Sequence, residues 1–239
     1  MLFMLHQMKM QQEKDEKQRH ANAVAHHHHH GIVTCVKQSN APVIWILGGP
    51  GCGKGTQCDK IVKKYNFKHF STGDLLRAEV ASGSDKGKEL KEIMSKGALV
   101  SNDDVLQILE RAMVKVSDSA NGFLIDGYPR EKDQGTAFEK YVAPVDLIIF
   151  FDCSDETMTA RILHRAKEST EVRADDNEEA IKIRLATFRK NTNEIMAQYQ
   201  QKTVVINAER GVDEIFADVQ AAIDNAVANK KQAAAAALS

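Results

Sequence analysis

The part of this sequence best suited to chemistry is a glycine-rich stretch with a single lysine, Gly48 to Thr56, which reads Gly-Gly-Pro-Gly-Cys-Gly-Lys-Gly-Thr. Residues without side chains let several backbone N–H groups approach a polyphosphate together. The lysine adds a point charge, and a following helix adds its positive N-terminal end. We therefore predict a polyphosphate site formed by Gly51, Cys52, Gly53, Lys54, Gly55 and Thr56.

One feature of this stretch departs from the general phosphate-loop pattern. Gly55 follows the lysine where the general phosphate-loop pattern has serine or threonine, and the hydroxyl comes one residue later, at Thr56. The alternative is a glycine-rich turn that binds nothing.

Further along the chain, Asp126 ends an apolar run. A carboxylate at this place is suited to binding Mg²⁺ through water, together with Thr56. The alternative for Asp126 is a turn or helix cap.

The elements that must position these residues alternate between short apolar runs and helical periodicity. The runs, which predict strands, cover residues 43–47, 67–70, 123–125, 147–151 and 204–206. Strands alternating with helices predict an α/β fold, a five-stranded parallel sheet flanked by helices on both faces. Ligands of such sheets bind beyond the carboxyl ends of the strands, which is where the glycine-rich stretch lies.

Composition excludes several classes of protein. The 239 residues are 43% hydrophobic and 27% charged with a formal net charge of −1, so no bulk field attracts nucleic acid or a membrane surface. The four cysteines, Cys35, Cys52, Cys58 and Cys153, form no CxxC pair and, by their spacing, no His/Cys metal-ligand set. Without a secretory signal, free thiols indicate a reducing compartment. We expect a cytoplasmic monomer with neither nucleic-acid nor membrane partners.

The two ends differ in composition from the rest. Residues 1–40 are polar, include the run His26–His30, and predict a disordered extension, with the histidines either a tag or a natural homopolymer tract. Residues 229–239 end in a run of alanines and predict a disordered tail. The folded domain is expected to cover 41–228.

Four separated motifs resemble those of the nucleoside monophosphate kinase family. They are the glycine-rich stretch, the run Ser71-Thr72-Gly73-Asp74-Leu75-Leu76-Arg77, the run Asp126-Gly127-Tyr128-Pro129-Arg130, and Arg173-Ala174-Asp175-Asp176-Asn177. The resemblance covers residues 43–227. It implies a P-loop core with a mobile helical segment over the monophosphate, residues 71–100, and a short lid over ATP, residues 164–176. Closure of such pieces keeps water away from the transferred group.

The resemblance also implies the roles of the charged residues. It places Arg77 and Arg130 on the AMP phosphate, and it places Arg161, Arg165, Arg173 and Arg184 around ATP and the transferring group, the last two also reaching AMP. Catalysis then rests on Lys54, Arg130, Arg165, Arg173 and Arg184, with Mg-ATP as the donor. Independently of the family, Arg161 and Arg165 stand four residues apart on one helix face, where like charges repel unless an anion lies near them.

The family pattern also directs attention to the bases. Gln134 offers a donor and an acceptor that match N1 and N6 of adenine, and the remaining AMP contacts are expected from Thr72, Ala98, Leu99, Val100, Gly127, Tyr128 and Pro129. Thr72 could instead cap the following helix, and Gln134 could be a surface side chain. Arg210-Gly211 stands where the adenylate branch commonly has its glycine one position earlier, so we expect Arg210 at the ATP adenine.

The function implied is reversible phosphoryl transfer from Mg-ATP to AMP. A UMP/CMP kinase is the first alternative, and a catalytically inactive nucleotide-binding protein is an alternative of another class. The family's lid usually carries glycines, whereas residues 166–172 have none and are about two residues longer.

Overall fold

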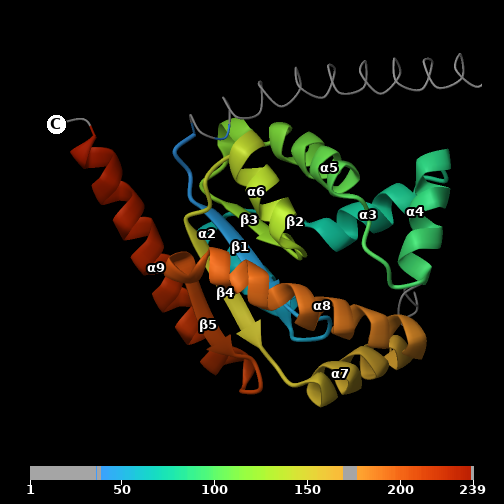
Figure 1. Ribbon diagram of the computed structural model, residues 1–239. Helices are drawn as coiled ribbons and strands as arrows, with labels where there is room; N and C mark the ends of the chain where they lie inside the picture. Colours follow the sequence, from blue (N-terminus) through green and yellow to red (C-terminus); the bar gives the residue numbers. More distant parts are fainter. Residues whose placement is uncertain (1–35, 37–38, 169–176, 238–239) are drawn as a thin grey trace, which may run out of the picture.

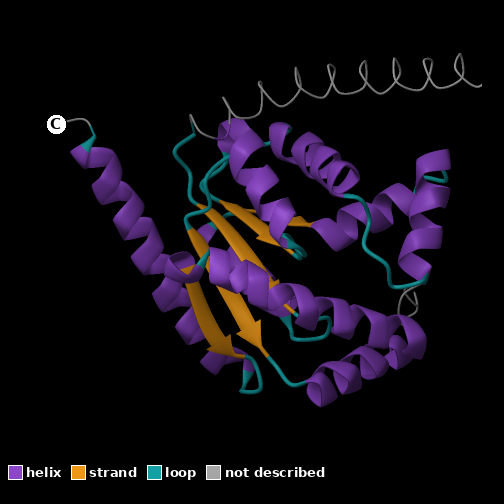
Figure 2. Cartoon of the chain, in the orientation of Figure 1, coloured by secondary structure: helices purple, strands orange, loops and turns teal. Residues whose placement is uncertain are grey.

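The computed structural model describes residue 36 and residues 39–168 and 177–237. Five parallel strands form one sheet in the order β2-β3-β1-β4-β5 (Figures 1 and 2). They are β1 Val43–Gly48, β2 Lys68–Ser71, β3 Phe123–Asp126, β4 Leu147–Asp152 and β5 Thr203–Asn207. All five strands predicted from apolar runs are present, each within one residue of the predicted bounds, and the predicted parallel α/β fold is confirmed.

Eight α-helices lie among the described residues: α2 Lys54–Tyr65, α3 Thr72–Ala81, α4 Asp85–Ser95, α5 Asn102–Val114, α6 Lys132–Tyr141, α7 Asp155–Glu168, α8 Glu178–Gln198 and α9 Val212–Ala236. Helices α2 and α9 cover one face of the sheet, and α5, α6 and part of α8 cover the other. Alternate residues of each strand therefore enter two separate cores, as a sheet buried on both faces requires. Trp45 of β1 is fully buried and meets Phe138 and Tyr199 edge to face.

Several helices begin at side-chain caps that are readable in the sequence. Ser71, Ser84, Ser101 and Asn177 each accept a hydrogen bond from the backbone N–H three residues later, at 2.9–3.2 Å. Such caps satisfy N–H groups that the first helical turn leaves without partners. They fix the starts of α3, α4, α5 and α8.

Two groups of helices flank the carboxyl ends of the strands. In Figure 1, α3 and α4 project from one side, while α7 and the beginning of α8 lie on the other. The segment 71–100, predicted to close over a monophosphate, comprises α3, α4 and the loop after them. Of the predicted lid, residues 169–176 lie outside the described residues.

The prediction of a disordered tail from residue 229 is wrong for the residues described, because α9 continues to Ala236. Alanine is the strongest helix former, so a run of alanines extends a helix that packing has already begun. Lys230 also anchors this end, since its Nζ donates to Ala41 O at 3.1 Å and to Asp146 Oδ2 at 2.7 Å. No described helix is both long and apolar enough to cross a membrane.

Candidate functional site

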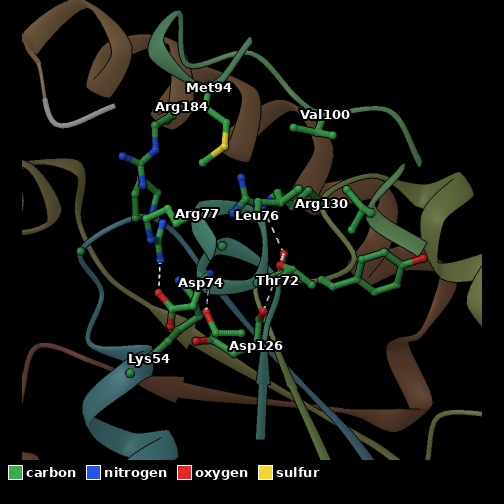
Figure 3. Close-up of a pocket in the computed structure, with 18 of the residues that line it drawn as sticks. Lys54, Thr72, Asp74, Leu76, Arg77, Met94, Val100, Asp126, Arg130 and Arg184 are labelled. Carbon is green, nitrogen blue, oxygen red and sulfur yellow. Dashed lines mark hydrogen bonds and ion pairs between the residues drawn. The ribbon is translucent and has the colours of Figure 1, made fainter. Parts of the chain in front are cut away.

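A cavity of about 450 Å³ opens at the carboxyl ends of the strands, between α3–α5 on one side and α7 and α8 on the other. Ser71 and Asp126, which are paired in the β2–β3 register, both line it. The basic side chains along its wall are Lys54, Arg77, Arg130, Arg161, Arg165 and Arg184, against two acidic ones, Asp74 and Asp126. Figure 3 labels all of these except Arg161 and Arg165. A nearly neutral chain thus concentrates positive charge in one cavity, as an anion site requires.

The glycine-rich stretch forms the floor of this cavity and leads from β1 into α2. Gly53 is the N-cap of α2 with φ +96°, a conformation that side chains rarely adopt, and the space where its Cβ would point is open. Gly51 has φ +83°, and a Cβ there would lie 2.5 Å from Met158 O of α7. Gly53, Lys54 and Gly55 line the cavity, so the N-terminus of α2 borders it, as phosphate binding at a helix start requires.

Lys54 turns toward its own loop. Its Nζ donates to Gly48 O at 2.8 Å and to Gly49 O at 3.0 Å. Both acceptors are neutral carbonyls, so a phosphate oxygen could replace them with a stronger, charge-assisted bond. The lysine is held at the cavity wall in a position from which it can take up an anion.

Asp126 ends β3 with only 8% of its surface exposed, and its Oδ1 is buried without a hydrogen-bond partner. A buried carboxylate oxygen with no partner is costly, and it is the donor that a hard cation takes. Asp126 therefore fits a place beside a phosphate-bound Mg²⁺. Thr56, the other predicted magnesium residue, also lines the cavity. The alternative role of Asp126 as a turn or helix cap is not supported at Oδ1, because this oxygen accepts no hydrogen bond.

Thr72 does not cap α3, because the capping side chain is Ser71. The Thr72 hydroxyl is buried and bonds to Asp126 O at 3.2 Å and Gly127 O at 3.0 Å. Gly127 has φ +74°, and a Cβ there would lie 3.2 Å from that hydroxyl. Thr72 thus ties helix α3 to the end of β3.

Gln134 is not a surface side chain: 2% of its area is exposed, and it lines the cavity. Its Oε1 accepts from the backbone N–H of Arg130 at 2.7 Å, and its own carbonyl accepts from Tyr128 Oη at 2.7 Å. Arg130 Nε donates to Gly127 O at 3.1 Å. Burial raises the pKa of the Tyr128 phenol, which stays a neutral donor. The predicted acceptor of Gln134 is therefore engaged with protein, leaving its amide donor for a ligand.

The other predicted arginines approach from three helices. Arg77 of α3 pairs with Asp74, and its guanidinium lies over Gly73. Arg161 of α7 donates to Cys52 O at 3.4 Å and to Ala208 O at 3.2 Å, so it links the glycine-rich loop to the segment after β5. Arg165 of α7 and Arg184 of α8 line the same cavity. Figure 3 labels Arg77, with its contact to Asp74 as a dashed line, and Arg184 among the residues that line the cavity.

Not every predicted residue reaches the cavity. Cys52 is buried beneath the loop, and Pro129 lines a smaller adjoining cavity of about 110 Å³ between the loop and α8. Arg210 pairs with Asp218 of α9 and donates to Asn207 O at 3.2 Å, away from the lining residues. Arg173 lies outside the described residues. The predicted Gly51, Gly53, Gly55, Ala98, Leu99, Val100, Gly127 and Tyr128 all line the main cavity.

Sequence reasoning missed some lining residues. Leu76, Met94, Gly97 and Val105 complete the wall on the α3–α5 side. The apolar periodicity of Leu76, Met94 and Val105 identifies them as core-facing, but it does not distinguish a core from a cavity. The sequence also indicated no metal-ligand set, whereas the fold brings Cys58, His69 and Asp126 together, with ligand atoms within 4.8 Å of one another.

Comparison with known proteins identifies relatives along nearly the whole chain. The family model described as adenylate kinase matches residues 46–204. Adenylate kinase 1 of Drosophila melanogaster is 53% identical over 241 aligned residues, covering 99% of both chains. Adenylate kinase isoenzyme 1 of Gallus gallus is 52% identical and that of Homo sapiens 50%, each covering 79% of this chain and 97% of the relative.

Proposed function

This chain belongs to the adenylate kinase family, and from that premise we propose that it transfers the terminal phosphoryl group of Mg-ATP to AMP, reversibly, giving two ADP. The observation that carries the proposal is the single cavity in which the glycine-rich loop and the arginines of α3, α7 and α8 meet. Two anionic substrates can be held end to end only where positive charge approaches from several directions. Membership of the adenylate kinase family favours AMP as the acceptor over UMP or CMP, and it favours an enzyme over an inactive nucleotide-binding protein.

On the donor side, we assign the ATP phosphates to the loop residues Gly51–Thr56, with Lys54 reaching the terminal groups. Arg161 and Arg165 approach from α7, and their mutual repulsion, four residues apart, is relieved by an anion between them. We also assign Arg173 to the transferring phosphoryl group, and we assign the backbone beside Arg210 to the adenine of ATP.

On the acceptor side, we assign the AMP phosphate to Arg77 and Arg130, with Arg184 shared between the two substrates. The base is proposed to lie against Ala98–Val100, with the Gln134 amide as donor to adenine N1. The Gln134 oxygen also accepts from the Arg130 backbone, so one hydrogen bond links the residue that recognises the base to the residue that binds the phosphate.

Mg²⁺ is proposed as the cofactor, entering with ATP. The unpartnered Asp126 Oδ1 fits it, with Thr56 nearby on the cavity wall and water completing the contact. The ion would neutralise charge on the phosphates. Beyond this, the protein's part is positioning: guanidinium groups and backbone N–H groups stabilise the equatorial oxygens while the segments 71–100 and 164–176 exclude water. A cytoplasmic monomer remains part of the proposal.

The test is a coupled assay of ADP formation from Mg-ATP with AMP, CMP or UMP as the acceptor. We expect kcat/KM for AMP to exceed that for either pyrimidine nucleotide by about 10³-fold or more, because a base site built on hydrogen bonds rejects mismatched partners strongly. A preference for CMP or UMP would assign the chain to the other branch. Nucleotide binding without turnover would establish the inactive alternative.

A further inference from the structure

Three side chains from three elements converge behind the floor of the cavity. Cys58 lies on α2, His69 on β2 and Asp126 at the end of β3, and one ligand atom from each lies within 4.8 Å of the other two. His69 and Asp126 share a face because β2 and β3 pair Ser71 with Asp126, and alternate residues point the same way. That face is the one α2 covers, with Cys58 fully buried in its core.

These groups are close without bonding to one another. His69 Nε2 is 3.8 Å from Asp126 Oδ2, which is too long for a hydrogen bond. Among the described residues, both His69 Nε2 and Asp126 Oδ1 are buried and make no hydrogen bond. Polar atoms left this way are costly and call for a missing partner. Two donors that share a tetrahedral Zn²⁺ lie about 3.3–3.8 Å apart, given bond lengths of about 2.0–2.3 Å.

We propose that Cys58, His69 and Asp126 form a binding site for a thiophilic divalent cation of the Zn²⁺ type. One thiolate, one neutral imidazole and one carboxylate are a ligand set that Zn²⁺ favours, whereas Mg²⁺ avoids sulfur. The fourth position falls to water from the cavity, which Asp126 also lines.

Charge balance agrees with this assignment. Burial, and after it the nearby Asp126 carboxylate, raises the pKa of the Cys58 thiol. Binding one Zn²⁺ forms the metal–sulfur bond as the S–H bond breaks, and the proton leaves to solvent. The product, one dication with one thiolate and one carboxylate, has no net charge and is cheaper to bury than a lone carboxylate.

The expected effect of a bound ion on activity rests on the proposed function. An ion at this site engages the carboxylate assigned to the phosphate-bound Mg²⁺, so occupancy is expected to inhibit phosphoryl transfer. Inhibition at this site differs from competition of Zn²⁺ for ATP itself, because it requires Cys58.

Binding is tested independently of turnover. The full chain, free of metal, is titrated with Co²⁺, a spectroscopic substitute for Zn²⁺, and the thiolate-to-cobalt charge-transfer absorption is recorded; Zn²⁺ is then added to displace it. We compare the wild type, Cys58→Ser, His69→Asn and the matched control Cys153→Ser, another buried free cysteine. His26–His30 are present in every variant and give no thiolate absorption.

We expect the absorption, one released proton per bound ion and displacement by Zn²⁺ in the wild type and Cys153→Ser. Cys58→Ser should lose the absorption, and His69→Asn should bind more than about 100-fold more weakly, beyond the usual effect of an outer-shell change. Zn²⁺ at concentrations that inhibit the wild type should leave Cys58→Ser active. The absence of the absorption in the wild type, or its persistence in Cys58→Ser, would overturn the site; equal inhibition of both proteins would overturn its regulatory role. A protein that binds Co²⁺ through Cys58 but never forms ADP would contradict the proposed function alone.

Discussion

Gln134 Oε1 accepts a hydrogen bond from the backbone N–H of Arg130 at 2.7 Å, joining the residue assigned to the base with the residue assigned to the phosphate of the same nucleotide. Both come from the segment between β3 and the first turn of α6. Gly127 O lies between them and Thr72, accepting from Arg130 Nε and from the Thr72 hydroxyl. The acceptor end of the cavity is thus a bonded network, and its two functions can be separated by substitution.

Gln134→Glu keeps the oxygen that holds Arg130 and removes the amide donor. If the amide recognises adenine, the KM for AMP should rise about 10-fold or more, since a buried ligand acceptor loses its partner. The KM for ATP should change little. Gln107→Glu, an exposed glutamine of α5, supplies the same charge change as a control. Steady-state kinetics with each substrate varied decides the matter; an unchanged KM for AMP would leave Gln134 with positioning alone.

Lys54→Met should abolish turnover while the fold survives. The lysine donates only to neutral groups of its own loop, the Gly48 and Gly49 carbonyls and the Cys52 sulfur, so the fold does not depend on its charge, whereas the transferring phosphoryl group does. Loss of one aligned cation should lower kcat by about 10³-fold or more. Circular dichroism and thermal unfolding monitor the fold, and Lys60→Met, on the same helix, is the control. Near-normal turnover in Lys54→Met would remove the phosphate-loop assignment.

Arg130→Ala should affect AMP much more than ATP. Its guanidinium is held at the Gly127 carbonyl, and the residue lines the cavity. We expect kcat/KM for AMP to fall by about 10²–10³-fold, the loss of about 3–4 kcal/mol of transition-state stabilisation. Arg111→Ala, which removes an exposed arginine of α5, provides the comparison. Equal increases in the Kd of both nucleotides, measured by calorimetry, would speak against this placement.

The sequence predicted the strands closely because each is a short apolar run between turn residues, and that pattern survives any tertiary arrangement. Helix α6 has no such signal: two of its buried positions, Gln134 and Gly135, are not large apolar residues. Gly135 is fixed by packing, since a Cβ there would lie 2.8 Å from Tyr199 Oη of a distant segment. Only the tertiary structure gives this reason for the glycine.

The functional site likewise has some residues that the sequence could predict and others that only the tertiary structure brings together. The glycine-rich loop and Asp126 could be found because their chemistry is local: residue types at fixed spacing after a strand. The Thr72 bond to Gly127 and the Cys58, His69 and Asp126 cluster join residues far apart in sequence, and they depend on strand register and on how α2 crosses the sheet. Spacing along the chain contains no information about such contacts.

Acid should destabilise the chain partly through Glu209. Hydrogen bonds from the Ser154 side chain, then from Thr157 and the Ser154 backbone, lower the pKa of this carboxyl below its usual value of 4.5. A group with a lowered folded-state pKa adds stability that is present above its unfolded pKa and is lost as pH falls through the folded one. In Glu209→Gln, the free energy of unfolding, measured with urea between pH 3 and about pH 7, should therefore depend less on pH. Glu194→Gln, which neutralises an exposed glutamate of α8, is the control. The same pH dependence of unfolding in the wild type and in Glu209→Gln would contradict the prediction.

Helix α9 should contribute to stability through one residue near its end. Lys230 bonds to Asp146 Oδ2, which also accepts from the backbone N–H of Val43 at 2.8 Å, so the lysine, the start of β1 and the residue before β4 share one carboxylate. The two side chains are each only 23% exposed, which makes the pair stronger than a surface ion pair. Lys230→Met should lower the free energy of unfolding by about 1–2 kcal/mol, since the carboxylate loses a charged donor. Lys231→Met changes the neighbouring exposed lysine and should alter stability by less than about 0.5 kcal/mol. Urea unfolding of both variants tests the difference; equal stabilities would mean that α9 gains nothing from this contact, and that its last turns are held by helix propensity alone.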